Sequence, residues 1–268
     1  MQVKRILKQN GFCRRKPLKN MATGASPNRE EQFRIISYLV AFFTIMPNNP
    51  ILSIDCKKKE ELGQLTRNEA VLCKGKATPD VFDHDYSYLA TGRVVTHGIY
   101  DEKLNKGFVS IGDSHETAPF VVDNLLWWWE NYGINDYPDA TTILILCDCG
   151  GVNGYRHHLF KKLLQEFARE TGLRVVVAHF PPYCSKYNPI ERRLFSHVHR
   201  TIQGTILTDI QQVKELMSKT RTSTGLEVKV RVVKKHYPTD VRSRKEDVDE
   251  KRICRHPELP NLSYTILP

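Results

Sequence analysis

Hydrophobic positions in the first part of the chain change from a helical to a strand-like spacing. Apolar residues recur at helical intervals from Phe33 to Phe43, after Pro27, which stands where the first turn of a helix tolerates proline. The pattern stops before the breaker cluster at residues 47–50. We therefore predict a helix there, followed by three strands, the last two of which form a hairpin. These strands span residues 51–55, 93–100 and 107–111.

The remainder of the chain alternates between amphipathic and uninterrupted apolar segments. The predicted helices span residues 117–132, 155–170, 188–203 and 210–220. The predicted strands span residues 141–147 and 173–180, and their continuous apolar runs are typical of strands buried on both faces of a sheet. The order β-β-β-α-β-α-β-α predicts an RNase H-like α/β fold, a mixed sheet flanked by helices. An added strand is expected at 226–235 and a charged, weakly structured tail at 241–255.

Charge and cysteine usage narrow the class of protein. The 268 residues include 40 Lys or Arg against 30 Asp or Glu, and the first twenty residues are basic, which predicts a short basic helix and arm. This excess favours nucleic acid as a partner, although solubility alone could explain it. The 7 cysteines include no CxxC pair, which indicates reduced thiols and a cytoplasmic protein. We expect no membrane span, because no apolar run reaches about 20 residues.

Three acidic residues fall where the predicted fold would bring them together. Asp55 ends the first strand, Asp148 ends the fourth, and these strands are neighbours in an RNase H-like sheet; the active crevice of open α/β sheets lies beyond the carboxyl ends of strands. Glu191 opens the helix after the fifth strand, at the head of a row continued by the apolar Phe195 and Val198. A metal ion would compensate the charge there, and clustered carboxylates can bind two divalent cations.

Each acid also has a purely structural interpretation. With Asn188 as N-cap, Glu191 occupies the capping-box position and could satisfy a backbone amide. Asp148 could be a turn residue at the end of a strand, and Asp55 could pair with Lys57. For any one of the three, we favour the structural interpretation; their joint placement on the three expected elements favours a catalytic triad.

Six motifs in the same order carry a family resemblance. They are SIDCKKKEE at 53–61, SHETA at 114–118, CDCGGVNGYR at 147–156, HFPP with Asn188 and IE at 179–191, RLFSH at 193–197, and NLSYT at 261–265. With these motifs the chain resembles the ISAzo-type insertion-sequence transposases, also called Rhodopirellula-type DDE transposases, from about Ser53 onward. The PPY and NPIE elements are also similar to those of mariner-type enzymes.

The resemblance implies a prokaryotic, nucleoid-associated enzyme that cuts and joins DNA. It implies Asp55, Asp148 and Glu191 as catalytic and metal-binding residues, two Mg²⁺ or Mn²⁺ ions, element ends and target DNA as partners, and a homodimer on DNA. It also implies a longer N-terminal region with a helix-turn-helix, of which we expect residues 1–25 to be a basic remnant in a truncated copy. Residues 26–222 would form the catalytic domain and 223–268 a C-terminal extension.

Several further residues are candidates for contacts around the triad. The basic residues expected to hold DNA phosphates are Lys57, Lys58, Lys59, Lys186, Arg192 and Arg193. For each of them a solvated basic face is an equal alternative. His115 and His179 lie near strand ends and are candidates to line the site, or else structural histidines.

Two other functions are compatible with the same residues. An RNase H-like nuclease would use the same triad to hydrolyse nucleic acid without joining strands. A non-catalytic DNA-binding remnant of a transposase would keep the fold and the charge without the reaction.

Overall fold

The computed structural model describes residues 2–13, 24, 26, 28–66, 70, 73, 75 and 78–268. The predicted basic arm at residues 14–19 and the predicted helix start at Pro27 lie outside the described residues. The described α-helices are α1 (Gln2–Gln9), α2 (Arg29–Thr44), α3 (Ala118–Trp128), α4 (Ile134–Asp136), α5 (His158–Thr171), α6 (Ser196–Ile202) and α7 (Ile210–Ser218). The described strands are β1 (Ile51–Leu62), β2 (Gly92–Asp101), β3 (Lys106–Gly112), β4 (Thr142–Cys147), β5 (Arg174–His179), β6 (Glu227–Val233), β7 (Ile253–Arg255) and β8 (Ser263–Ile266).

Short helical turns connect or extend these elements. The 3₁₀ turns are η1 (Ser87–Leu89), η3 (Gly151–Asn153), η4 (Ser185–Tyr187), η6 (Lys245–Asp247) and η7 (Glu250–Arg252). Two π-helical segments, η2 (Trp129–Gly133) and η5 (Glu191–Phe195), continue into α4 and α6. A π-helical segment is rare and is frequent at functional sites, and η5 carries one of the predicted catalytic acids.

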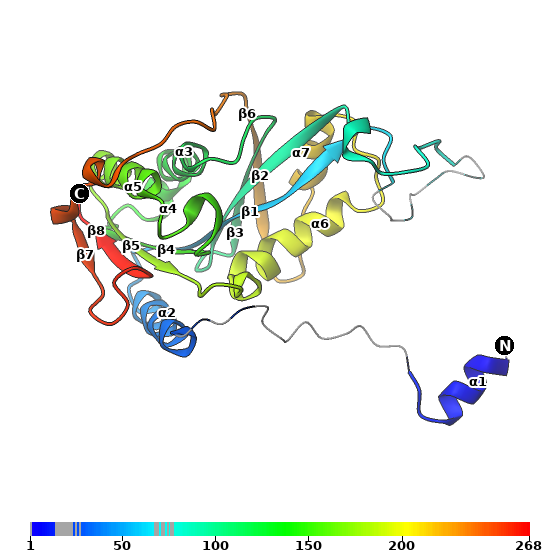
Figure 1. Ribbon diagram of the computed structural model, residues 1–268, viewed down its shortest axis with the longest axis horizontal. Coiled ribbons are helices and arrows are strands. Elements are labelled where there is room, and N and C mark those ends of the chain that lie inside the picture. The colour runs from blue at the N-terminus through cyan, green and yellow to red at the C-terminus, as the bar shows by residue number, and fades with distance from the viewer. Residues whose placement is uncertain are drawn as a thin grey trace.

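The described strands form one eight-stranded sheet in the order β6-β3-β2-β1-β4-β5-β8-β7. β1, β4 and β5 run parallel at its centre, whereas β2 is antiparallel to β1 and to β3. Helices cover both faces (Figure 1): α3 and α5 pack on one face, and α2, α6 and α7 pack on the other. The predicted fold class and element order, with β1 beside β4, are confirmed.

The end of the chain differs from its prediction. The predicted strand at 226–235 is present as β6, which pairs in parallel with β3 at one edge of the sheet. The expected weakly structured tail instead contains η6, η7 and β7, and β8 pairs with β5 near the opposite edge. Val248 and Ile253 are buried in the core, and with hydrogen bonds between Asp249 and Gln165 they hold this charged segment on the fold. No helix among the described residues is long and apolar enough to span a membrane.

Candidate active site

The register of β1 and β4 places the two aspartates level with each other. Ser53 pairs with Leu146 in this parallel ladder, so two residues further along Asp55 and Asp148 occupy equivalent positions. Side chains alternate between the faces of a sheet, and neighbouring strands lie about 4.8 Å apart. The two carboxyl groups therefore point to the same face from adjacent strands. β1 continues beyond Asp55 to Leu62, while Asp148 lies just past the end of β4.

Glu191 reaches this face because its helix packs unusually close to β2. Gly98 pairs with Asp55 across β1 and β2. A Cβ atom on Gly98 would lie 2.6 Å from the Phe195 ring and 2.9 Å from Cδ1 of Ile190, so a larger residue would displace these side chains or the helix that carries them. The glycine lets the segment that carries Glu191 lie against the sheet beside Asp55.

The three carboxyl groups perturb one another. Burial, together with the negative charge of Asp148, raises the pKa of Asp55 to about 8. Burial raises the pKa of Asp148 to about 6, and Glu191 adds to this shift. Burial also raises the pKa of Glu191, although Lys57 and a hydrogen bond with the Asp55 carboxyl group oppose that change. Groups that repel in this way favour either a shared proton or a bound cation.

Asn188 connects the segment that carries Glu191 to β1 and to Asp148, a role that the sequence did not indicate. Its buried amide donates from Nδ2 to the Ile54 carbonyl at 3.1 Å and to Asp148 Oδ1 at 3.4 Å, and its Oδ1 accepts from the Ser53 hydroxyl. The predicted N-cap bond is absent among the described contacts; instead the Ser53 oxygen accepts from the Ile190 amide at 3.0 Å. The full burial of this amide beside Asp148 is a tertiary feature that the local sequence does not encode.

Glu116 is a fourth acid beside the triad. It precedes α3 in the SHETA motif, forms a hydrogen bond with the Cys56 thiol and contributes to the raised pKa of Asp55, after burial and the nearer acids. Cys56 neighbours Asp55 on β1 and so points to the opposite face of the sheet. Glu116 thus influences the site from the side of α3, and only its place in a shared motif could have indicated it.

The predicted phosphate-binding residues divide into groups. Lys57 forms an ion pair with Glu60. It also lies close enough to Glu191 to lower the pKa of that carboxyl group, which opposes the rise caused by burial. Lys58 and Lys59 are exposed on β1 beyond Asp55.

The other predicted basic residues lie on or near η4 and η5. Lys186 lies over the Tyr187 ring, and Arg192 donates from Nε to the Lys186 carbonyl at 3.3 Å. Arg193 lies near Glu102 instead. Burial raises the pKa of Glu102 to about 7, and the positive charge of Arg193 partly opposes this rise.

The two candidate histidines lie on different sides of the site. His115 is exposed after β3, and its ring meets the His236 ring with centroids 5.8 Å apart. His179 is fully buried behind Asp148, where Nδ1 lies 3.0 Å from the Asp148 carbonyl oxygen. Neither contact reaches the carboxyl groups themselves.

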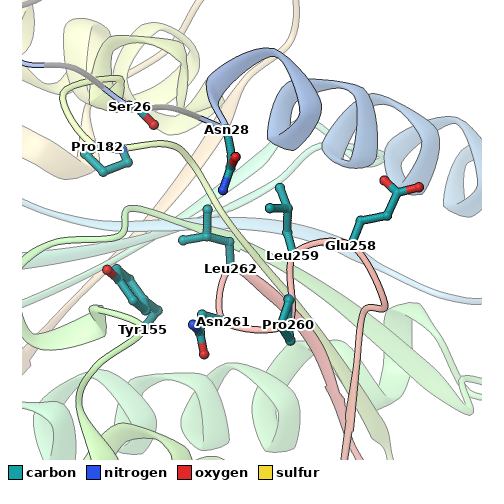
Figure 2. A pocket seen from close by; sticks show the side chains of 9 residues that line it. All are labelled: Ser26, Asn28, Tyr155, Pro182, Glu258, Leu259, Pro260, Asn261 and Leu262. Carbon is teal, nitrogen blue, oxygen red and sulfur yellow. The ribbon is translucent and has the colours of Figure 1, made fainter.

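A pocket of about 260 Å³ lies near the start of α2 (Figure 2). It is bounded by the start of α2, the loop with Tyr155, Pro182, and the turn from Glu258 to Leu262 before β8. Its lining does not include any of the three acids. The three acids therefore do not belong to this pocket.

The donor set fits a hard divalent cation. Mg²⁺ and Mn²⁺ prefer carboxylate oxygen, and three half-buried carboxyl groups with raised pKa values supply it. Among the described residues, however, no group of three His, Cys, Asp or Glu side chains is arranged so that it could hold a metal ion without rearrangement. Their mutual effects on pKa show that the fold places the three acids near one another despite their repulsion, and the assignment of a metal to them is a proposal.

Comparisons with known proteins agree with the fold. The family model described as the Rhodopirellula transposase DDE domain matches residues 1–268, so the match begins well before Ser53, where the motifs begin. No curated protein matches the sequence. Similar solved structures include the "Mos1 transposase paired-end complex with left transposon end" and the "Mos1 mariner paired end complex with Mn", with TM-scores of 0.52 and 0.53.

The structural likeness is one of fold. Both Mos1 chains are 11% identical to this sequence, and the alignments cover 80% of this chain and 60% of the Mos1 chains. The Mos1 strand transfer complex is similar to the same extent, with 11% identity and a TM-score of 0.52. The chain thus spans about 60% of the length of these neighbours, and the RNase H-like architecture is what they share.

Proposed function

The chain belongs to the family of the Rhodopirellula transposase DDE domain, and we propose that it is a metal-dependent polynucleotidyl transferase that cleaves DNA at element ends and joins it to target DNA. Asp55, Asp148 and Glu191 are its proposed catalytic carboxylates. The observation that carries the proposal is their convergence: Asp55 on β1 is level with Asp148, just past the end of the adjacent β4, and Glu191 is hydrogen-bonded to Asp55.

The chain's own residues hold and orient the proposed ligand oxygens. The Cys56 amide donates to Asp55 Oδ1 at 2.8 Å, and Asn188 Nδ2 donates to Asp148 Oδ1 at 3.4 Å. When bound there, two Mg²⁺ or Mn²⁺ ions would activate a hydroxyl nucleophile and neutralise charge on the leaving oxygen. The attacking group would be water in cleavage and the freed 3′-hydroxyl in joining. Raised carboxyl pKa values favour cation binding above neutral pH.

Exposed cations near the triad supply the proposed DNA contacts. Lys58 and Lys59 extend β1 beyond Asp55, while Lys186 and Arg192 lie before and on the helix of Glu191. Such contacts would position the phosphate backbone without reading its sequence. A paired-end complex is known for the Mos1 neighbour, and we propose that two copies of this chain likewise assemble on DNA ends. Replacing Lys58 and Lys59 by alanine should weaken DNA binding and make it less dependent on salt.

A cleavage assay tests the assignment. Asp148→Asn and Glu191→Gln should abolish metal-dependent strand cleavage of DNA that carries the inverted repeats flanking the gene, while DNA binding is retained. Glu166→Gln, a change at an exposed acid on α5, is the matched control and should leave cleavage unchanged. Cleavage retained by Asp148→Asn would reject the triad.

The same assay with a target plasmid separates the two alternative functions. A transposase gives covalent products in which an element end is joined to the plasmid. Metal-dependent nicking without joined products would indicate a nuclease instead. A folded chain that binds DNA but neither cleaves nor joins it would indicate a non-catalytic remnant.

A further inference from the structure

His179 and Tyr264 form a buried connection between β8, the last strand in the chain, and the backbone of Asp148. We propose that Tyr264, acting through His179, is a positioning residue that holds Asp148 in the geometry needed to bind a divalent cation. This inference rests on the proposed function. It gives a role to the HFPP and NLSYT motifs, which lie far apart in the sequence and provide none of the three acids.

Asp148 needs such support because it lies outside the sheet. The ladder between β4 and β5 ends at the pair of Cys147 and His179, and Asp148 follows it directly. The Asp148 carbonyl oxygen lies 3.0 Å from Nδ1 of His179. The His179 ring thus bonds to the first backbone carbonyl beyond the strand.

The partners of His179 fix its tautomer. A carbonyl oxygen can only accept, so Nδ1 must carry the proton that it donates to Asp148. Nε2 then has a lone pair and accepts from the Tyr264 hydroxyl group at 3.1 Å. Without the Tyr264 hydroxyl, Nε2 of the fully buried His179 would have no hydrogen-bond donor. The imidazole ring would then be free to reorient toward the Cys147 thiol, whose sulfur lies 3.3 Å from Nδ1.

Tyr264 is itself held rigidly. It is almost completely buried, pairs with Val177 in the antiparallel ladder of β5 and β8, and lies under the Lys161 ammonium group, which is 5.5 Å from its ring centre. From α2, Gln32 donates to the His179 carbonyl at 2.7 Å and to the Ser263 hydroxyl at 3.1 Å. Both sides of His179 are therefore fixed to β8, and through it the end of the chain supports the active site.

Binding of Mn²⁺ to the full chain, followed by the electron paramagnetic resonance signal of the free ion, tests the inference without any catalytic reaction. Tyr264→Phe removes one hydroxyl and keeps the ring over which Lys161 lies. We expect its Mn²⁺ affinity to fall by up to about tenfold, since partners bonded directly to a metal ligand are typically worth 10- to 100-fold and Tyr264 acts one residue further away. Circular dichroism should show an intact fold.

Two substitutions of His179 separate positioning from packing. The side-chain nitrogen of asparagine can occupy the place of Nδ1, whereas that of glutamine reaches the place of Nε2. His179→Asn should therefore keep a donor to Asp148 and retain more Mn²⁺ affinity than His179→Gln. Equal affinities for the two variants would overturn the inference, because a merely structural role would not depend on which nitrogen is preserved.

Tyr137→Phe is the matched control. Tyr137 is equally buried, and its hydroxyl group bonds to Asp101 at 2.9 Å, near the start of β1 and away from the triad. This variant should lose stability but keep Mn²⁺ affinity. Asp148→Asn should lose Mn²⁺ binding. If Asp148→Asn loses binding while Tyr264→Phe keeps it, the inference fails and the proposed function stands; if Asp148→Asn also keeps it, the proposed metal site fails and the inference with it.

Discussion

The Ser53 hydroxyl donates a hydrogen bond to the side-chain oxygen of Asn188, which is 135 residues away in the sequence. The same hydroxyl oxygen accepts from the Ile190 amide at 3.0 Å. Through this pair, β1 is connected to the segment that leads into the Glu191 helix. The connection lies between two of the proposed catalytic acids, so its integrity should matter for stability and for activity.

Asn188→Ala should therefore destabilise the protein and reduce cleavage together. It would leave the Ser53 hydroxyl and the Ile54 carbonyl without their buried partner, which costs about 2–4 kcal/mol of unfolding free energy. Urea denaturation measures the loss. In a double-mutant cycle with Ser53→Ala, we expect a coupling of about 1 kcal/mol or more. Strictly additive effects would show that the two residues act independently.

Gly98→Ala tests the close approach of the Glu191 helix to β2. The added methyl group would lie 2.6 Å from the buried Phe195 ring, so this ring, or the helix that carries it, must shift. We expect a loss of about 1–3 kcal/mol in unfolding free energy, with reduced cleavage because Glu191 moves away from Asp55. Gly150→Ala is the stability control, since its φ is −105° and nothing lies within 4 Å of an added Cβ. Equal stability of the two variants would contradict this explanation.

Asp55→Asn should stabilise the metal-free protein at alkaline pH. Burial and Asp148 raise the pKa of Asp55 from 3.8 to about 8 in the fold, so the carboxyl group of the unfolded chain ionises first as pH rises. Stability that is present below pH 4 is therefore lost progressively up to about pH 8. The variant escapes this loss, and we expect it to be more stable than the wild type by over about 1 kcal/mol at pH 8 in EDTA.

The control for this prediction is the pH at which the comparison is made. Near pH 4 the advantage of Asp55→Asn should disappear, because the wild-type carboxyl group is then protonated in the fold. Added Mn²⁺ should stabilise the wild type and not the variant. An advantage that is independent of pH would indicate a packing effect rather than ionisation.

His97 should make the protein sensitive to acid. Its ring is fully buried on β2, both nitrogens lack a hydrogen-bond partner among the described residues, and burial, with a contribution from Arg231, lowers its pKa from 6.5 to about 3. Below pH 6.5 His97 binds a proton in the unfolded chain but stays neutral in the folded protein. The free energy of unfolding therefore falls as the pH decreases from 6.5 toward 3.

His97→Leu should remove that part of the pH dependence. Between pH 7 and pH 5 the wild type should lose about 2 kcal/mol more unfolding free energy than the variant. Urea denaturation at the two pH values measures the difference. Parallel losses in both proteins would mean that the acid sensitivity arises at other groups.

The sequence by itself determined the element order and the chemical nature of the site. Uninterrupted apolar runs predict β4 and β5 as central strands, because a strand covered on both faces has no polar side. Placing Asp55 and Asp148 at strand ends, and Glu191 at the head of an apolar helical row, is also a local property of the chain. These patterns were sufficient to predict the fold class, but not the length of β1, which continues from Asp55 to Leu62, so Asp55 lies within the strand rather than at its end.

Only the tertiary structure decided how the site is supported and where the chain ends. Asn188, Glu116 and Tyr264 act through partners far away in the sequence, and their roles depend on full or partial burial, which no local pattern encodes. β7 and β8 join the sheet although their segment is short, because β8 pairs with β5 and β7 pairs with β8, long-range pairings that no local pattern predicts. Composition and periodicity determine which elements form, whereas long-range contacts determine which side chains meet.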